Sequence, residues 1–408
     1  MSQLKDLCEL IVDCEHKTAP TQETGYPSIR TPNVGRGRLI LDGVNRVSEE
    51  TYHAWTQREV PQPGDLILAR EAPIGNVAIV PPGLKLCLGQ RTVLIRPDRR
   101  FVNPQYLTYL LLGDEIQGKI LSISNGATVH HLNMKDIREL EMRPLPTPQI
   151  QDRIADILSG YDDLIENNTR RIIVLENMAQ LLYREWFVNF RFPGHRKVRM
   201  VQSELGPIPA GWMPKRLGDL CSETRRGVDP GEIDPATPYI GLEHLPRKSI
   251  ALGEWGRAGD VGSTKLRFKR GEILFGKIRP YFHKVGVAPI DGVASSDAIV
   301  IVPNDPAYFG LVLCCVSSED FVRHATQTSQ GTKMPRANWD VLTKYPLPLP
   351  SGALLKQFNG IIHPTVEMLQ NLVFRNRNLR TTRDFLMPKL ISGEIPVEAV
   401  AGLVEQAV

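Results

Sequence analysis

The sequence has no long apolar run. Nothing in it approaches the roughly 18 consecutive apolar residues that a membrane-spanning helix needs. The first residues, MSQLKDLCELIVDCEHK, carry acidic side chains inside their only apolar run, which excludes a secretory signal peptide. Strong charge is also absent, and a net charge of +4 is compatible with nucleic-acid binding without indicating it. We therefore expect a cytoplasmic protein that contacts no membrane.

Motifs of catalysis and metal binding are missing as well. The six cysteines form no C-x-x-C pair and no Cys/His zinc spacing, so we expect reduced thiols, no metal site and no cofactor. No phosphate-binding G-x-x-x-x-G-K-[ST] loop is present, and no G-x-G-x-x-G follows a strand-like run. Asp305-Pro306-Ala307-Tyr308 approximates the Asp/Asn-Pro-Pro-Tyr motif of amino methyltransferases, but its third residue is Ala. The matching Asn103-Pro104-Gln105-Tyr106 is explained as a helix start, so we predict a chain without catalytic residues.

What the sequence does contain is two long helical patterns. From Gln149 to Phe190, apolar residues recur at spacings of four and three, as in the seam of a coiled coil. The same seam returns from Leu354 to Leu390 with a constant shift, which places Arg171 on Arg375. The predicted seam residues are Ile150, Ile154, Ile157, Tyr161, Leu164, Asn168, Ile172, Leu175, Ala179, Leu182 and Trp186 in the first helix, and Leu354, Phe358, Ile361, Thr365, Met368, Leu372, Asn376, Leu379 and Leu386 in the second.

The whole chain is duplicated, and not the helices alone. Residues 4–8 return as 217–221, residues 64–68 as 271–275, and the proline-rich segment 144–148 as 346–350. Each half begins with short strand-like runs and continues into a helix. The predicted strands are 65–69, 76–80 and 90–95 in the first half and 272–275, 284–287 and 298–302 in the second, and the predicted helices are 104–112 and 306–316.

These patterns define the expected fold. A chain of 408 residues exceeds one comfortable core, so more than one domain is expected. We predict an α+β fold with two β-rich globular domains separated by two long antiparallel helices that form a coiled coil, arranged as a pseudo-two-fold internal repeat. The expected boundaries are 1–148 for the first domain, 149–192 for the first helix, 193–212 for a connector, 213–350 for the second domain, 351–393 for the second helix and 394–408 for a short extended tail.

Loops in equivalent places of the two halves are rich in Arg, Lys, Gln, Asn and Thr. Arg side chains suit guanine, Gln and Asn suit adenine, and Lys and hydroxyl groups suit phosphates. A solvated surface charge explains any one of these residues better, but their paired placement supports the set. The candidate DNA-contacting residues are Arg30, Asn33, Arg36, Arg38, Arg70, Gln90, Arg91, Thr128 and His130 in the first half, and Arg225, Arg226, His244, Lys277, Arg279, Tyr281, Lys284, Ser295, Ser296, Thr332, Lys333 and Arg336 in the second.

Three further segments resemble a known family. They are EWFVNFRFPG at 185–194, GPIPAGW at 206–212 ahead of LGDL at 217–220, and LRTTRDFLMPKLISGEI at 379–395. With the duplicated strand at 64–68 and the Pro-Leu-Pro entry to each helix, the sequence resembles the specificity subunit of Type I restriction-modification systems over essentially its entire length.

The resemblance implies a non-catalytic subunit. Each target-recognition domain would read one half of a bipartite double-stranded DNA site, and the helices would set the gap between the halves. Two copies of a methyltransferase subunit would bring S-adenosylmethionine and methylate adenine, and restriction subunits with ATPase and nuclease activity could join them. Two alternatives stay open. One is a coiled-coil scaffold or adaptor in another DNA-modification or phage-defence complex; the other, which the missing pocket motifs disfavour, is a stand-alone methyltransferase.

Overall fold

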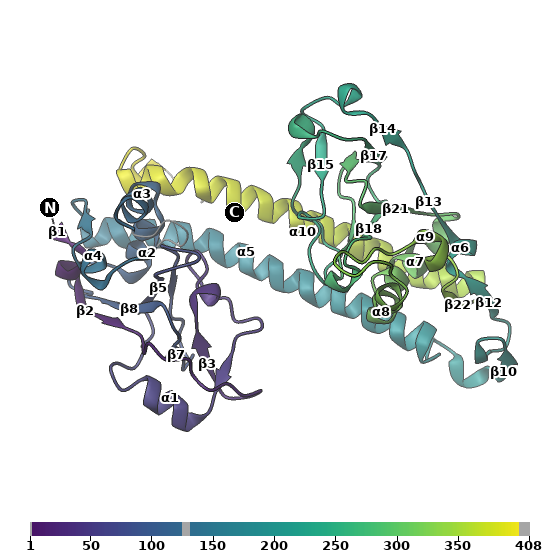
Figure 1. The fold of residues 1–408 in the computed structure, drawn as a ribbon, viewed down its shortest axis with the longest axis horizontal. Helices are drawn as coiled ribbons and strands as arrows, with labels where there is room; N and C mark the ends of the chain where they lie inside the picture. Colours follow the sequence, from purple (N-terminus) through teal and green to yellow (C-terminus); the bar gives the residue numbers. More distant parts are fainter. Residues whose placement is uncertain (1, 125–130, 400–408) are drawn as a thin grey trace. The chain divides into compact units, whose positions relative to one another are not determined.

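The computed structural model describes residues 2–124 and 131–399 (Figure 1). The chain forms two compact units: unit 1 is Met1–Asp163 with Arg380–Val408, and unit 2 is Leu164–Leu379. Each unit therefore holds one β-rich globular part and one half of each long helix. None of the helices in the described ranges is long and apolar enough to cross a membrane.

Unit 1 is built on a four-stranded antiparallel sheet in the order β2-β8-β5-β6. Its central strand β5 (Leu66–Ala69) is buried on both faces, because successive side chains of a strand point to opposite sides. Leu66 and Leu68 pack into a core with helices α2 and α3, whereas Ile67 and Ala69 pack against the small sheet β4-β3-β7. The remaining elements are β1 (Ser2–Gln3), η1 (Leu4–Leu7), β2 (Cys8–Asp13), β3 (Tyr26–Ile29), η2 (Thr31–Asn33), β4 (Arg46–Val47), α1 (Glu49–Trp55), β6 (Val77–Ile79), β7 (Cys87–Leu88), β8 (Thr92–Pro97), α2 (Pro104–Leu112), α3 (Asp114–Ile123), α4 (Met134–Arg138) and β9 (Glu141–Met142).

Unit 2 repeats this sheet in the order β13-β21-β18-β19. A second sheet, in the order β14-β17-β20-β15-β16, packs against one face of β18 (Ile273–Gly276). On that face Leu274 packs with Ala294 and Phe268. The other elements of its globular part are η4 (His195–Lys197), β10 (Met200–Ser203), β11 (Gly206–Pro209), β12 (Met213–Arg216), α6 (Leu217–Leu220), β13 (Cys221–Glu223), β14 (Gly227–Val228), η5 (Pro230–Glu232), β15 (Pro238–Ile240), β16 (Gly256–Arg257), η6 (Ala258–Asp260), β17 (Lys265–Phe268), η7 (Pro280–Phe282), β19 (Val285–Val287), β20 (Gly292–Ala294), β21 (Ala298–Pro303), η8 (Pro306–Tyr308), α7 (Phe309–Val316), α8 (Glu319–Gln327), α9 (Trp339–Leu342) and β22 (Pro346–Leu349).

The predicted strands and helix starts are confirmed to within a few residues. The Asn103 side chain caps α2 by accepting the backbone N–H groups of Gln105 and Tyr106 at 2.8 and 3.0 Å, with Pro104 as the first helical residue. Asp305 does the same for Ala307 at 2.8 Å. The Asn/Asp-Pro motifs are therefore helix caps in both units.

The two long helices are α5 (Pro148–Tyr183) and α10 (Gly352–Ser392). In unit 2 the buried side-chain amide of Asn168 donates to that of Asn376 at 2.9 Å. In the turn that continues α5, at Arg184–Val188, the ring of Trp186 lies 5.6 Å from that of Phe358. Residue numbers thus rise along one helix as they fall along the other, so the two halves in this unit pack antiparallel.

The predicted seam is wrong at four positions. Ile150, Leu164, Ile361 and Met368 are 36, 55, 45 and 43% exposed. Leu158 and Ile165, outside the predicted seam, are buried instead. The reason is that each helix packs against a globular part as well as against the other helix, which rotates the buried face away from a simple two-helix seam.

The ends of both helices also differ from expectation. The first helix was expected to reach residue 192, but α5 ends at Tyr183 and a π-helical turn follows at Arg184–Val188. Phe190 then takes a left-handed conformation (φ 56°), because the aromatic rings of Phe187, Phe190 and Phe192 all pack around Trp212. Gly393 (φ 77°) ends α10 as predicted, but the tail beyond it is not simply extended, since residues 397–399 form a helical turn that buries Val397.

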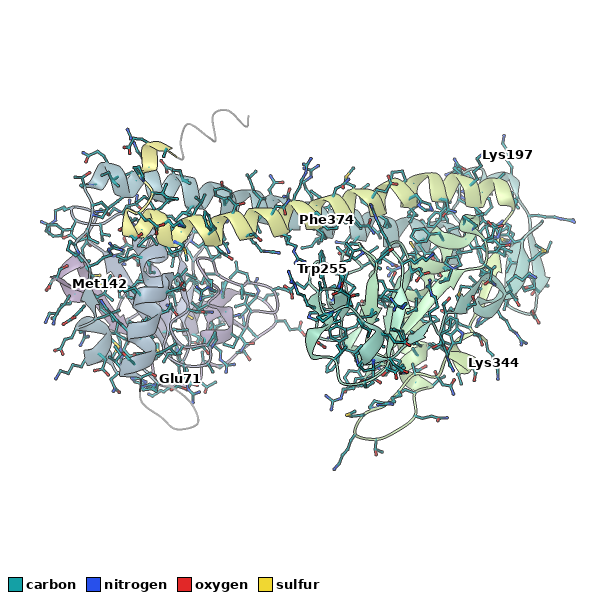
Figure 2. All side chains as sticks on the ribbon, turned by 90° about the horizontal axis from the view of Figure 1, so that it is seen from above. Glu71, Met142, Lys197, Trp255, Lys344 and Phe374 are labelled. Atoms are coloured by element: carbon teal, nitrogen blue, oxygen red, sulfur yellow. The ribbon has the colours of Figure 1, made fainter. Side chains whose placement is uncertain are left out.

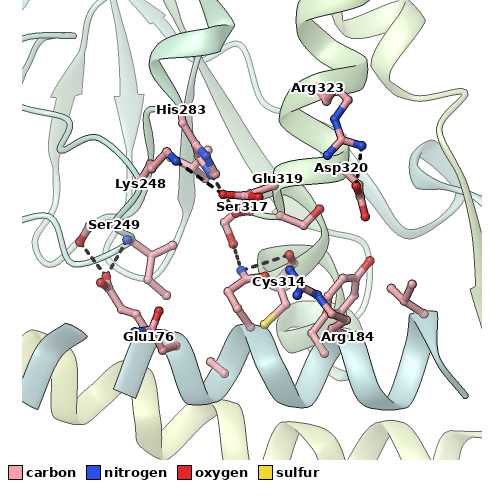
Figure 3. A pocket seen from close by; sticks show the side chains of 18 of the residues that line it. Glu176, Arg184, Lys248, Ser249, His283, Cys314, Ser317, Glu319, Asp320 and Arg323 are labelled. Carbon is pink, nitrogen blue, oxygen red and sulfur yellow. Dashed lines mark hydrogen bonds and ion pairs between the residues drawn. The ribbon is translucent and has the colours of Figure 1, made fainter. Parts of the chain in front are cut away.

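A polar contact fixes the β-rich part of unit 2 to α5. One carboxylate oxygen of Glu176 accepts the Ser249 hydroxyl at 2.7 Å and the backbone N–H groups of Ile250 and Ala251 at 2.8 and 3.0 Å (Figure 3). Glu176, Ser249 and Ile250 border a cavity of about 440 Å³ that Gln180 and His283 also line. On the α10 side, Trp255 packs edge-to-face on Phe374 at 5.9 Å (Figure 2).

The buried asparagine pair should behave as one unit. Replacing Asn168 alone by Leu leaves the buried amide oxygen of Asn376 without its donor, and replacing Asn376 alone leaves the amide nitrogen of Asn168 without its acceptor. Either change should lower the free energy of unfolding by about 1–3 kcal/mol. Replacing both should cost less than the sum of the single changes. A double-mutant cycle of denaturant unfolding measures the difference, and strictly additive losses would contradict the account.

Glu176 should make stability depend on pH. Burial raises the pKa of Glu176, which its three hydrogen bonds only partly offset, so folding favours the protonated form. The stability that the folded state gains from the protonated Glu176 is fully present below the ordinary glutamate pKa. It is lost as the pH rises through the raised pKa of the folded state. Glu176→Gln should therefore gain stability relative to wild type between acid and neutral pH. Glu176→Ala removes the acceptor of the Ser249 hydroxyl and of the Ile250 N–H, and should lose about 1–3 kcal/mol. Equal losses for both variants at neutral pH would show that the charge itself stabilises the contact.

Candidate nucleic-acid interface

The antiparallel register of unit 1 brings three separate loops to one edge of its sheet. Ala69 at the end of β5 pairs with Thr92 at the start of β8, so the residues beyond them meet. The Arg70 N–H donates to the Arg91 carbonyl at 2.9 Å, and the Leu132 N–H donates to the Arg70 carbonyl at 3.2 Å. We call this surface edge 1: residues 70–76, 89–91 and 131–132.

Unit 2 builds the same edge with the same hydrogen bonds. Gly276 at the end of β18 pairs with Ala298 at the start of β21. The Lys277 N–H donates to the Asp297 carbonyl at 3.0 Å, and the Ala337 N–H donates to the Lys277 carbonyl at 2.8 Å. We call this surface edge 2: residues 277–284, 295–297 and 330–337. The internal repeat therefore extends to individual hydrogen bonds.

A fourth loop joins each edge through a parallel strand pair. The Gly89 N–H donates to the Ile29 carbonyl at 2.8 Å, and the Ser295 N–H donates to the Ile240 carbonyl at 2.9 Å. This brings the turns that begin at Arg30 and at Gly241 beside edges 1 and 2.

Two predicted DNA-contacting residues close these turns. Asn33 accepts the Arg30 N–H through its amide oxygen at 3.1 Å, and His244 accepts the Gly241 N–H through Nδ1 at 2.9 Å. Because Nδ1 accepts, a neutral His244 carries its proton on Nε2. Both side chains therefore shape their loops.

Edge 1 is organised around a buried arginine. Arg70 donates to both carboxylate oxygens of Asp13 at 2.9 and 2.8 Å, to the Leu132 carbonyl at 2.8 Å, and to His131 Nε2 at 2.9 Å. His131 Nδ1 in turn lies 2.7 Å from Glu71, whose other oxygen lies 2.7 Å from the Arg91 guanidinium. Arg70 was expected to contact DNA, but its guanidinium is fully engaged inside the unit.

The exposed side of edge 1 carries other candidates. Arg30 and Arg91 are exposed, and Arg91 holds a left-handed backbone (φ 66°). The amide of half-buried Gln90 donates to the His16 carbonyl at 3.3 Å. Thr128 and His130 lie outside the described residues.

Edge 2 is more strongly cationic. The Arg279 N–H donates to the Pro335 carbonyl at 2.7 Å, and its guanidinium donates to the Lys333 carbonyl at 3.3 Å. Arg336 forms a 3.5 Å ion pair with Asp297. The remaining exposed candidates here are Tyr281, Ser296, Thr332 and Lys333, and Ser295 is half-buried.

The ammonium groups of two lysines in edge 2 each donate a hydrogen bond to a backbone carbonyl. The Lys277 ammonium donates to the Ser296 carbonyl, and that of Lys284 donates to the Leu242 carbonyl. Burial, reinforced by nearby Arg247, lowers the pKa of Lys284. Lys284 thus ties edge 2 to the turn that begins at Gly241, whereas half-buried Lys277 bonds within edge 2.

Four other candidates lie away from the edges. Arg36 donates to the Leu112 carbonyl at 3.0 Å, and Arg38 pairs with Asp163 on α5. Arg226 pairs with Glu272, at the other end of β18 from Lys277, and Arg225 pairs with Glu223 at 2.7 Å. The structure therefore does not bring these four arginines to the edges.

Sequence reasoning missed several members of the edges. Glu71 and Asp297 were not among the candidates, yet both hold cations in place. Exposed Arg247 was also missed; its guanidinium lies 4.2 Å from the centroid of the Phe282 ring. Its position in the basic Arg247-Lys248 pair, three residues after His244, was the available signal.

One group of side chains has the composition of a metal site. Ligand atoms of Asp13, Cys14 and His16 lie within 4.8 Å of one another. Both carboxylate oxygens of Asp13, however, accept hydrogen bonds from Arg70, and burial raises the pKa of the Cys14 thiol. A guanidinium at this distance opposes a cation, so we assign the group to the ion-pair network of edge 1.

Comparisons with known proteins agree on one family. Residues 1–177 match the family described as Type I restriction modification DNA specificity domain. The type I restriction enzyme HindI specificity subunit of Haemophilus influenzae is 32% identical, covering 74% of this chain and 80% of its own. The MjaIX specificity subunit of Methanocaldococcus jannaschii is 28% identical, covering 88% and 84%. The crystal structure of the S subunit of a Type I restriction-modification system from M. genitalium shares the fold, with a TM-score of 0.60 at 14% identity, covering 96% and 95%. The chain therefore belongs to the specificity subunits of type I restriction-modification systems.

Proposed function

We propose that each unit of this specificity subunit reads one half of a bipartite double-stranded DNA site. Type I specificity subunits recognise the DNA sequence, and the catalysis of their systems lies in partner subunits. The observation that carries the proposal is the repetition of the same loop-to-loop hydrogen bonds at edges 1 and 2. The two edges share one backbone arrangement but carry different side chains. Two half-sites of different sequence require this combination.

The exposed and rim side chains of the edges are the proposed DNA contacts. Arginine and glutamine can read base edges, whereas lysine and hydroxyl groups position phosphates. Thr128 and His130 stay in the set on sequence grounds. The proposed contacts are Arg30, Gln90, Arg91, Thr128 and His130 for unit 1, and Lys277, Arg279, Tyr281, Ser295, Ser296, Thr332, Lys333 and Arg336 for unit 2.

The helices are proposed to set the gap between the half-sites. Both α5 and α10 continue from one unit into the other, which supports this role. The hydrogen bond between Asn168 and Asn376 supports a single register for the helix pair. A coiled-coil arrangement with pseudo-two-fold symmetry follows from this proposal.

The same helices are proposed to dock two copies of a methyltransferase subunit, which restriction subunits can join. Val174, Met178 and Leu181 support this: they are exposed at helical spacing on α5, on the face turned away from the Glu176 contact. S-adenosylmethionine and the methylation of adenine belong to those partners. We place the assembly in the cytoplasm, together with its DNA substrate.

Exchanging residues 1–148 for the first domain of another specificity subunit should change one half of the methylated motif only. The junction falls at Pro148, the first residue of α5, so edge 2 and most of both helices keep their contacts. Sequencing of methylated sites in cells that also express the methyltransferase subunit measures the motif. The matched exchange of residues 213–350 should change the other half. A change in both halves after either exchange would refute the assignment of one half-site to each unit.

A further inference from the structure

The turn at the tip of edge 2 is held in an unfavourable backbone conformation. The short helical turn Pro280–Phe282 is flanked by Arg279 and His283, both in the left-handed region with φ of 49° and 53°. Residues with a Cβ rarely adopt this conformation, and it persists where the surroundings impose it. Strain of this kind tends to gather at binding sites.

The surroundings hold this turn from three directions. Arg279 donates its N–H to the Pro335 carbonyl at 2.7 Å. The buried imidazole of His283 donates to the Ser317 carbonyl at 2.9 Å, and the His283 carbonyl accepts the Lys248 N–H at 2.8 Å. The turn is therefore rigid, and whatever it exposes is presented in one fixed position.

What it exposes is an aromatic ring. Tyr281 is 51% exposed and touches Phe282 edge-on, with ring centroids 4.9 Å apart. Met334, 50% exposed, belongs to the adjoining loop and precedes the Pro335 that bonds Arg279. In the described part of residues 213–350, the only other large apolar side chain this exposed is Met213. Two of three such side chains thus lie in the most cationic loops of the unit.

The exposed apolar side chains and the cations of edge 2 suit different parts of a DNA duplex. Phosphates attract cations, and an apolar side chain gains nothing from them. The apolar surfaces of a duplex are the faces of its bases and the methyl group of thymine. We propose that Tyr281 and Met334 contact bases of the half-site read by unit 2, while Lys333 and its neighbouring cations hold the phosphates. This inference rests on the proposed function.

Edge 1 lacks such a tip. Its corresponding loop, residues 70–76, contains no aromatic residue, and Ile74 packs against the core of unit 1. Within the described part of edge 1, residues 70–76 therefore offer no counterpart to Tyr281, and the two half-sites would be read by different side chains at this position.

The test measures equilibrium binding of the full chain, assembled with its methyltransferase partner, over a range of salt concentrations. The two duplexes carry the methylated motif mapped with the wild-type chain, or the same motif with the half-site of unit 2 scrambled. Tyr281→Ala should weaken binding to the intact motif about five- to hundredfold. It should leave binding to the scrambled duplex, and the dependence of affinity on salt, unchanged. Tyr281→Phe should bind like wild type.

Two control variants separate this role from the others. Lys333→Ala should weaken both duplexes alike and flatten the salt dependence, as the loss of a phosphate contact does. Phe101→Ala, which removes an exposed ring outside both edges, should change nothing. Equal weakening of both duplexes by Tyr281→Ala, or no weakening, would overturn the inference. A wild-type complex that failed to distinguish the two duplexes would instead refute the proposed function.

Discussion

Two buried asparagines, Asn168 and Asn376, meet between α5 and α10, and their hydrogen bond is satisfied in only one register of the helices. A shift in register would break this hydrogen bond and leave a buried amide donor and acceptor unpaired, at a cost of about 1–3 kcal/mol. The globular parts depend on the same register because they bind both helices. In unit 2 the segment 249–255 contacts both helices. The Ile250 N–H donates to Glu176 of α5, and the ring of Trp255 packs on Phe374 of α10.

Edges 1 and 2 show how one backbone frame can carry different side chains. Arg70 and Lys277 occupy equivalent positions and make equivalent backbone hydrogen bonds, yet their side chains differ in role. Arg70 is drawn inward by Asp13, whereas Lys277 stays near the surface beside Ser296. Because the frame is held by main-chain groups, side chains at the edges can change without altering the sheet beneath them.

The sequence was sufficient for features that depend on local pattern or on the repeat. The strands around Leu66 and Ile273, the Asn103 cap and the end of α10 at Gly393 all follow from short-range chemistry and were predicted correctly. The exposure of Leu164 and Met368 could not be predicted, since it depends on how a third surface packs against the helix pair. The burial of Arg70 likewise depends on Asp13, 57 residues away in sequence and close only in the fold. Composition identified the loops that carry cations; only the strand registers show which of them meet.

The measurement that tests the central claim most directly is a map of methylated adenines across a genome. This chain would be expressed with its methyltransferase subunit, and the map compared with one made without the chain. The account predicts a gapped two-part motif that disappears when the chain is omitted. An ungapped motif, or methylation that does not depend on the chain, would contradict it.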